Sequence, residues 1–171
     1  MRYPLFFFLS AIYNRHNTKT TTYPFIFAAH AAVRRRTMSN LQKISDYFTE
    51  TGMFFLATAD GTQPKCRPLG LQRIIDGQLY FGVGDFKDVY KQLVANPQVE
   101  LVASRQQDWL RVYGKAVFEK DDTLSKKIVA EAPFLQSIYN DETGHKLAVF
   151  HLENATAEFR SMLQVEESFT F

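Results

Sequence analysis

Hydrophobic positions near residue 40 follow a helical period. Apolar side chains separated by three, three and one residues share one face of a helix, and here they are Leu41, Ile44, Tyr47 and Phe48. Ser39 or Asn40 offers a side-chain oxygen that suits an N-cap, and Thr51-Gly52 ends the pattern. We therefore expect a short amphipathic helix with one face against a core.

Further along, apolar and aromatic runs alternate with polar residues at a period of two, which is typical of strands. Asp60-Gly61 and Asp76-Gly77 predict tight hairpin turns. The predicted strands are Met53–Ala59, Lys65–Ile75, Gln78–Val83, Gln98–Ser104, Trp109–Glu119, Lys146–Leu152 and Thr156–Ser161. Strands joined by such turns are antiparallel, so the pattern favours a mostly β fold.

Helical or irregular segments separate these strands. Asp85 is expected to cap a helix over Phe86–Ala95. Three more segments complete the pattern, namely a helix over Asp121–Glu131, a helical or turn segment over Pro133–Tyr139 and a C-terminal arm over Glu166–Phe171. This arrangement predicts a closed or nearly closed antiparallel barrel of six to seven strands with flanking helices.

The first 37 residues differ in composition from the rest of the chain. They carry six basic residues and no acidic one, and residues 5–12 form a short apolar run like the core of a signal peptide. A basic, threonine-containing, acid-free segment also resembles an organelle transit peptide. Because the amphipathic pattern begins at Met38, we interpret 1–37 as a poorly ordered leader or upstream extension and 38–171 as the folded domain.

Charge and cysteine content narrow the function. From Met38 onward, 14 basic residues face 18 acidic ones, a net charge of −4. This balance lacks the basic surface that nucleic-acid binding needs, and the apolar run at 5–12 is shorter than the roughly 20 residues that span a membrane. Cys66 is the only cysteine, which excludes an intrachain disulfide and suits a reducing, cytoplasmic compartment. The four histidines show no metal-ligand spacing, so no metal is expected.

Two segments combine a cation with backbone that suits an anion. Lys65–Gly70 contains Arg67, and Phe81–Lys87 ends with Lys87 beside the start of a predicted helix. We expect the strands that carry them to be hairpin partners, which would bring both cations to one end of the hairpin. Arginine offers a planar fork and lysine a compact charge for a phosphate monoester, and a helix N-terminus adds unpaired backbone N–H groups.

Gly82 and Gly84 would let a flat ligand approach the backbone closely. The alternative is that Arg67 and Lys87 are solvated surface charges and that the glycines serve the turn. The glycines do not form a dinucleotide-binding fingerprint, and the chain has neither a P-loop nor a nucleophile elbow. These residues alone leave both interpretations open.

Five segments, in this order and spacing, resemble the pyridoxamine 5′-phosphate oxidase-like family of FMN-binding split β-barrels. They are Lys65–Pro68, Asp76–Phe81, Lys87–Leu93, Asn96–Val99 and Trp109–Phe118. The resemblance extends from about Leu41 to Arg160. It implies a split β-barrel, a homodimer and two FMN molecules in clefts between the subunits.

The resemblance also implies roles for particular residues. Arg67 and Lys87 would bind the FMN phosphate. The backbone around Pro68-Leu69 and around Val83-Gly84 would line the isoalloxazine ring, and Gln92 would reach the polar edge of the flavin.

On the same basis, Trp109 and Arg111 would lie at the dimer interface and contact the flavin of the other subunit. Trp109 could equally be a plain interface or core anchor. Members that oxidise pyridoxamine phosphate end in a basic motif, whereas this chain ends with Glu166 and Glu167 and has only Arg160 nearby. Because these carboxylates would repel a second phosphate, vitamin B6 oxidation is doubtful here, and we expect a flavin-dependent oxidoreductase of an unknown small substrate.

Two alternatives stay open. The chain could hold FMN, a deazaflavin or haem without turnover, with His145 and His151 as the only candidate haem ligands. It could also be a cofactor-free interaction barrel in which Arg67 and Lys87 are incidental. No acid or base stands out for catalysis, although Arg111, Tyr113 and Lys115 are expected near the mouth of the barrel.

Overall fold

The computed structural model describes residues 40–171, which begin with a helix over residues 40–51. The predicted apolar face of this helix is confirmed, because its four hydrophobic side chains are all buried in the main core, namely Leu41, Ile44, Tyr47 and Phe48. The predicted boundary at Met38 and the basic segment 1–37 lie outside the described residues.

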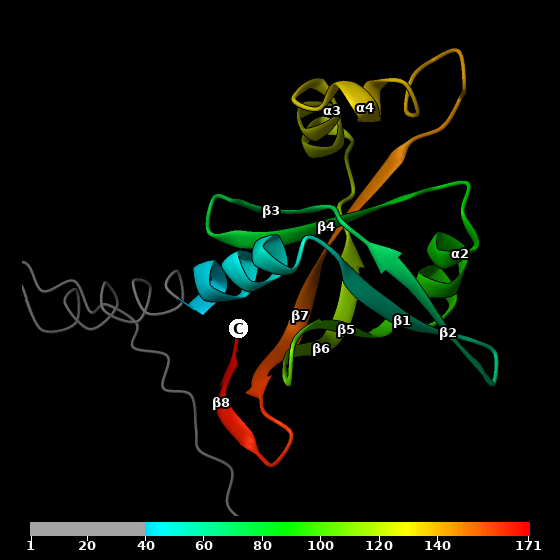
Figure 1. Ribbon diagram of the computed structural model, residues 1–171. Coiled ribbons are helices and arrows are strands. Elements are labelled where there is room, and N and C mark those ends of the chain that lie inside the picture. The colour runs from blue at the N-terminus through cyan, green and yellow to red at the C-terminus, as the bar shows by residue number, and fades with distance from the viewer. Residues whose placement is uncertain (1–39) are drawn as a thin grey trace, which may run out of the picture.

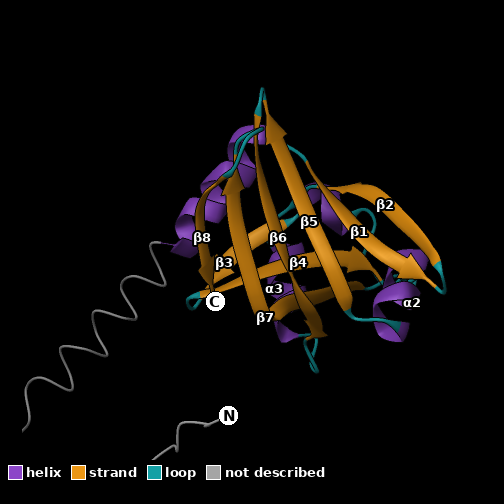
Figure 2. Ribbon diagram, turned by 90° about the horizontal axis from the view of Figure 1, so that it is seen from below, coloured by secondary structure: helices purple, strands orange, loops and turns teal. Residues whose placement is uncertain are grey.

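Eight antiparallel strands form one sheet in this part of the chain (Figure 1). Their order is β2-β1-β5-β6-β7-β4-β3, and β8 pairs with β7 beside this path (Figure 2). The strands are β1 Phe54–Asp60, β2 Gln63–Leu69, β3 Gln72–Ile75, β4 Gln78–Gly84, β5 Gln98–Arg105, β6 Asp108–Phe118, β7 Leu147–Arg160 and β8 Val165–Thr170. The predicted fold class, mostly β and antiparallel with flanking helices, is confirmed.

The sheet curls so that distant strands share one core. Phe54 on β1 and Phe81 on β4 are separated by three strands in the sheet order, yet their ring centroids lie 5.9 Å apart. Phe48 of the N-terminal helix packs on Phe54 with 4.3 Å between the ring centroids. Leu101 on β5 and Leu110 on β6 are fully buried in the same cluster. A barrel-like core results, which places the strand ends and the helices around its rim.

One predicted strand, Lys65–Ile75, is wrong in its extent. It is two strands, β2 and β3, which lie at opposite ends of the sheet order, with β2 paired to β1 and β3 to β4. Proline has no N–H and tolerates only an edge position, which Pro68 occupies on β2. Past the break, Gln72 is buried against the N-terminal helix, where it bonds to Ser45. The strands of Arg67 and Lys87 are therefore not hairpin partners.

The C-terminal strands also differ from the prediction. The two predicted strands Lys146–Leu152 and Thr156–Ser161 merge into one continuous strand, β7, which runs from Leu147 to Arg160 and accommodates Asn154 at a φ of 52°. Asparagine tolerates this left-handed conformation better than most residues, so the strand bends instead of ending. The expected arm at Glu166–Phe171 pairs with β7 as strand β8.

Three helices connect the strands beyond β4, namely α2 Asp88–Ala95, α3 Thr123–Ala130 and α4 Pro133–Gln136. Ile128 of α3 and Leu135 of α4 form a second buried cluster with Leu147 and Val149 of β7. Both helices lie above β4 in Figure 1. A Cβ at Gly82 would lie 2.5 Å from Leu71 Cδ2, so this glycine is explained by internal packing. None of the helices in residues 40–171 is long and apolar enough to cross a membrane.

Candidate functional site

Arg67 reaches from the edge strand β2 to the buried side of β1 and to helix α2. Its Nη1 group donates to Thr58 Oγ1 at 2.7 Å and to the carbonyl oxygen of Leu56 at 3.0 Å. Its Nη2 group donates to Gln92 Oε1 at 2.7 Å, and the Thr58 hydroxyl donates to the same oxygen at 2.7 Å. We call Arg67, Thr58 and Gln92 the arginine triad. Because each member bonds to the other two, the guanidinium is held in one orientation.

The charge of the arginine triad is not neutralised within the described residues. Thr58 and Gln92 are buried, Arg67 is half-buried, and no carboxylate of residues 40–171 forms an ion pair with Arg67. Burial lowers the pKa of Arg67, because the half-buried cation is partly desolvated. Neutral acceptors use only part of the five N–H donors of a guanidinium. A fixed, desolvated cation with spare donors is suited to an anionic ligand.

Lys87 occupies the N-cap position of α2, the helix that carries Gln92. The structure therefore brings both predicted cations to one helix, Arg67 through its bond to Gln92 and Lys87 at the helix start. Lys87 is exposed, and its ammonium group lies 5.8 Å from the centroid of the Phe86 ring. The expected cap at Asp85 is wrong, because Asp85 Oδ1 accepts a hydrogen bond from the backbone N–H of Lys146 at 3.0 Å.

The backbone positions predicted to line a flavin lie on strands β2 and β4. Val83 and Gly84 are buried and pair with Ala148 and Leu147 of β7. A Cβ at Gly84 would lie 2.7 Å from the Phe86 ring, so this side of the glycine is covered by the chain itself.

On the edge strand β2, Pro68 is exposed, whereas Leu69 is half-buried and packs on the main core. Only β2 therefore offers accessible backbone of the predicted kind beside the arginine triad.

Trp109 and Arg111 lie on the opposite side of the sheet from the arginine triad. Side chains of β6 alternate between buried and half-buried, and both residues belong to the half-buried row that faces away from the core. The Arg160 guanidinium lies 5.8 Å from the centroid of the Trp109 ring. Within one protomer the structure does not bring these two residues to Arg67.

Arg111 differs from Arg67 because its charge is compensated. Its Nη2 group donates to Glu100 at 2.7 Å, and its Nη1 group lies 3.9 Å from Glu158. The hydrogen bond that Arg111 donates to Glu100 raises the pKa of Arg111, with the charges of Glu100 and Glu158 adding to the effect. Glu158 also accepts bonds from Arg160 and Tyr113. Arg111 is thus part of a surface ion-pair network.

Thr58 belongs to the candidate site but was not identified from the sequence. The sequence did contain a signal for Thr58. The inward face of β1 carries Phe54, Leu56 and Thr58, so the threonine hydroxyl interrupts an otherwise apolar row. A buried hydroxyl needs a partner, which Arg67 and Gln92 provide. Neither partner could be assigned without the pairing of β1 with β2.

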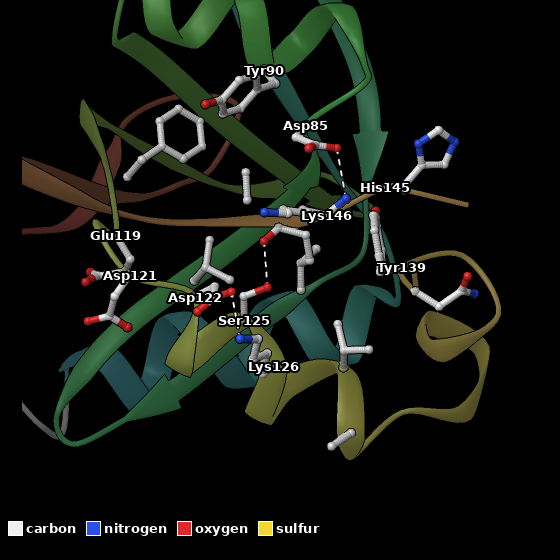
Figure 3. A pocket seen from close by; sticks show the side chains of 18 of the residues that line it. Asp85, Tyr90, Glu119, Asp121, Asp122, Ser125, Lys126, Tyr139, His145 and Lys146 are labelled. Atoms are coloured by element: carbon white, nitrogen blue, oxygen red, sulfur yellow. Dashed lines mark hydrogen bonds and ion pairs between the residues drawn. The ribbon is translucent and has the colours of Figure 1, made fainter. Parts of the chain in front are cut away.

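A separate cavity of about 650 Å³ lies between the start of α2, the end of β6, helix α3 and the start of β7 (Figure 3). Tyr90 and Phe118 form an aromatic wall with 4.9 Å between their ring centroids. Ser125 ties α3 to β7 by donating to the carbonyl oxygen of Leu147 at 2.7 Å. Asp85 and Tyr139 also line the cavity and contribute polar groups. No pattern in the sequence indicated this cavity.

The two candidate haem-ligating histidines have partners within the chain. His151 Nδ1 lies 2.9 Å from Glu119 Oε1, and the His145 ring stacks on Phe86 with 3.8 Å between the ring centroids. Within residues 40–171, no group of three or more histidine, cysteine, aspartate or glutamate side chains is arranged to hold a metal ion.

Comparison with solved structures shows which proteins share this fold. A NimC/NimA family protein from Clostridium acetobutylicum is 24% identical, with a TM-score of 0.71 over 81% of this chain and 96% of that one. General Stress Protein 26 from Bacillus anthracis is 17% identical, with a TM-score of 0.53 over 77% and 98%. A heme binding protein from Mycobacterium smegmatis is 16% identical, with a TM-score of 0.55 over 78% and 57%.

Comparison with curated protein sequences finds no match. The sequence profile of a family described as pyridoxamine 5′-phosphate oxidase matches residues 41–160. This match covers the N-terminal helix, seven of the eight strands of the sheet and the arginine triad. The fold, the order of its elements and this match agree, and the chain belongs to the pyridoxamine 5′-phosphate oxidase family.

Proposed function

We propose that this protein binds FMN and is an oxidoreductase of a small substrate, with the phosphate of the cofactor on Arg67 and Lys87. The observation that carries the proposal is the arginine triad, in which a half-buried guanidinium is fixed by neutral acceptors. A dianionic phosphate would supply the charge that this guanidinium lacks within residues 40–171. Lys87 adds a second, exposed cation from the N-cap of the same helix.

The remaining predicted residues have supporting roles in this proposal. Gln92 and the missed residue Thr58 orient Arg67. The accessible backbone at Pro68 and Leu69 of β2 lies beside the isoalloxazine ring, whereas Val83 and Gly84 are covered by the chain and have no direct contact with the ring in this proposal. When bound, the flavin supplies the electron chemistry, and the protein orients it and excludes solvent.

A homodimer is part of the same proposal. Phe55 is 48% exposed and lies on the outward face of β1, where it pairs with Val102 of β5. Arg111 of β6 is the cross-strand partner of Val102 on this face, and Trp109 lies two residues before Arg111 on the same strand. A second copy that covers this face would bury the exposed ring and bring Trp109 and Arg111 to the cofactor of its partner. Sedimentation equilibrium measures the assembly, and a monomer at micromolar concentration would contradict it.

The substrate is a small molecule other than pyridoxamine phosphate in this proposal. Glu166 and Glu167 lie on β8, where Glu166 bonds to Ser161 and Glu167 pairs with Lys43. These carboxylates leave the C-terminal strand without the cations that a phosphorylated substrate requires. The exposed, unpaired Cys66 supports a reducing, cytoplasmic location.

The absorption spectrum of the purified protein tests the cofactor. Flavin bands close to one per chain are expected, and bleaching by NADH or NADPH would support an oxidoreductase. A Soret band would point instead to haem, and a colourless protein that gains no bands with added FMN would contradict the proposal.

Comparison of FMN with riboflavin isolates the phosphate. We expect FMN to bind at least about 100-fold more tightly than riboflavin, because each hydrogen bond to a charged group contributes about 1.5–3 kcal/mol. Replacing Arg67 and Lys87 together by alanine removes this preference, whereas the control pair Arg73→Ala with Lys91→Ala keeps it. A double variant of Arg67 and Lys87 that still prefers FMN would refute the phosphate assignment.

A further inference from the structure

The cavity between α2, β6, α3 and β7 has the size and walls of a small-molecule site. Its volume of about 650 Å³ lies within the usual range for ligand pockets. Tyr90 and Phe118 form one wall, and Tyr139 faces the cavity from the other side (Figure 3). Aromatic side chains of this kind bind flat organic groups and attract cations over their ring faces.

Asp85 places a carboxylate at this cavity without a cationic partner. Its Oδ1 atom is fixed by the backbone N–H of Lys146 at 3.0 Å, and its own backbone N–H donates to the Lys146 carbonyl oxygen at 3.0 Å. No lysine, arginine or histidine of the described chain forms an ion pair with Asp85. The carboxylate is half-buried and pre-positioned, which makes it suited to a charged hydrogen-bond donor from outside the chain.

The overall charge of the cavity lining is negative, like that of Asp85. Five carboxylate side chains and three lysines line it, and one lysine, Lys126, is paired with Asp122 at 2.8 Å. Lys146 extends across the cavity in Figure 3 and is exposed, so it can move aside into solvent. Asp85 also contributes to a raised pKa of Tyr139, after the larger effect of burial. The Asp85 side of the cavity is therefore negative and partly desolvated.

We infer that this cavity is a second ligand site, which takes a small organic cation with an aromatic body and places its ammonium group on Asp85. The aromatic body lies among Tyr90, Phe118 and Tyr139. The inference does not depend on a flavin, because none of these residues belongs to the arginine triad or has been assigned to the cofactor.

A series of three probes with the same aromatic body tests the charge. They are 2-phenylethylamine, which is protonated at neutral pH, the neutral 2-phenylethanol and the anionic 3-phenylpropanoate. Binding to the unmutated protein is followed by NMR shifts of tyrosine ring signals, with Tyr139→Phe and Tyr90→Phe to assign them. The amine is expected to bind about tenfold more tightly than the alcohol, and the anion least tightly.

Asp85→Asn removes the charge while its amide oxygen can still accept the bond from Lys146. We expect this variant to lose about tenfold in amine affinity and to keep its alcohol affinity. The matched control is Asp60→Asn, which neutralises an exposed carboxylate at the end of β1. We expect it to change neither the amine affinity nor the alcohol affinity. Equal binding of amine and anion, preference for the anion, or no shift at Tyr90 and Tyr139 with any probe would overturn the inference. The ranking of probes on the unmutated protein decides the matter even if Asp85→Asn fails to fold.

Discussion

Arg67 and Arg111 are both half-buried arginines on β-strands, yet their surroundings differ in charge. Arg67 bonds only to neutral oxygen atoms, from Thr58, Gln92 and backbone carbonyls. Arg111 lies between Glu100 and Glu158, and its Nε atom is buried without a partner in the described part of the chain.

The pKa values reflect this difference in opposite directions. Burial lowers the pKa of Arg67, whereas the hydrogen bond to Glu100 raises the pKa of Arg111. A cation with carboxylate partners already has its counter-charge, and a ligand must compete with them. A cation fixed by neutral groups has none, so an arriving anion gains the full interaction. The comparison teaches that the partners of an arginine, more than its exposure, indicate whether it is available to a ligand.

Removal of each guanidinium is the strongest test of this difference. Arg67→Met is expected to weaken FMN binding by about 100-fold or more, because it removes a charge-assisted contact worth about 2–5 kcal/mol. Arg111→Met should weaken it less than about tenfold, because an exposed ion-pair network contributes little. Titration of flavin fluorescence measures both, and circular dichroism checks that each variant is folded. Equal losses in the two variants would show that the carboxylates do not keep Arg111 from the ligand.

The neutral partners of Arg67 can be tested without touching the charge. Thr58→Val keeps the shape of the side chain and removes the hydroxyl that links Arg67 to Gln92. We expect FMN affinity to fall about tenfold and riboflavin affinity to stay the same, since only the phosphate contact depends on the guanidinium. Thr58→Ser restores the hydroxyl and should restore FMN affinity. A parallel loss of FMN and riboflavin binding would mean that Thr58 acts on the fold alone.

Local patterns predicted much of the fold. The alternation of Leu110 and Val112 with Arg111 and Tyr113 is seen in β6, and the buried face of the N-terminal helix is as expected. These features depend on neighbours in the chain, whose periodicity is visible in the sequence.

Features that depend on distant segments were predicted less well. The break between β2 and β3 requires the N-terminal helix to bury Gln72, and nothing near Gly70 in the sequence shows this. Asp85 is a suitable helix cap by residue type, but the start of β7 competes for its carboxylate through Lys146. Arg67 was identified by its type and its resemblance to the family motif. Its link to Thr58 required the register of β1 and β2.

Acid titration tests whether the carboxylates around Arg111, and Glu158 in particular, stabilise the fold. The pKa of Glu158 is lowered chiefly by the hydrogen bond from Arg160, and also by the Tyr113 hydroxyl and the charge of Arg111. A carboxyl with a lower pKa in the folded state stabilises the fold above its unfolded pKa of about 4.3 and loses this contribution as the pH falls through the folded value.

We therefore expect Glu158→Gln to lower the free energy of unfolding by about 1 kcal/mol at pH 7, and we expect this difference to shrink as the pH falls below about 4.3. Urea denaturation across this pH range measures the difference. A constant difference at all pH values would mean that the charge of Glu158 contributes nothing. Flavin affinity at pH 7 should change little, since Arg67 lies on the other face of the sheet.

Lys87 is expected to have the smallest effect, and it separates exposed from half-buried cations. An exposed ammonium is screened by salt, whereas a partly buried guanidinium is screened much less. Lys87→Met should weaken FMN binding by about two- to fivefold at low ionic strength, and by less at 0.5 M salt. The contribution of Arg67 to FMN affinity should be about the same at low ionic strength and at 0.5 M salt. A loss after Lys87→Met as large as that after Arg67→Met, and equal at both salt concentrations, would make the exposed lysine the principal phosphate ligand and the arginine triad its support.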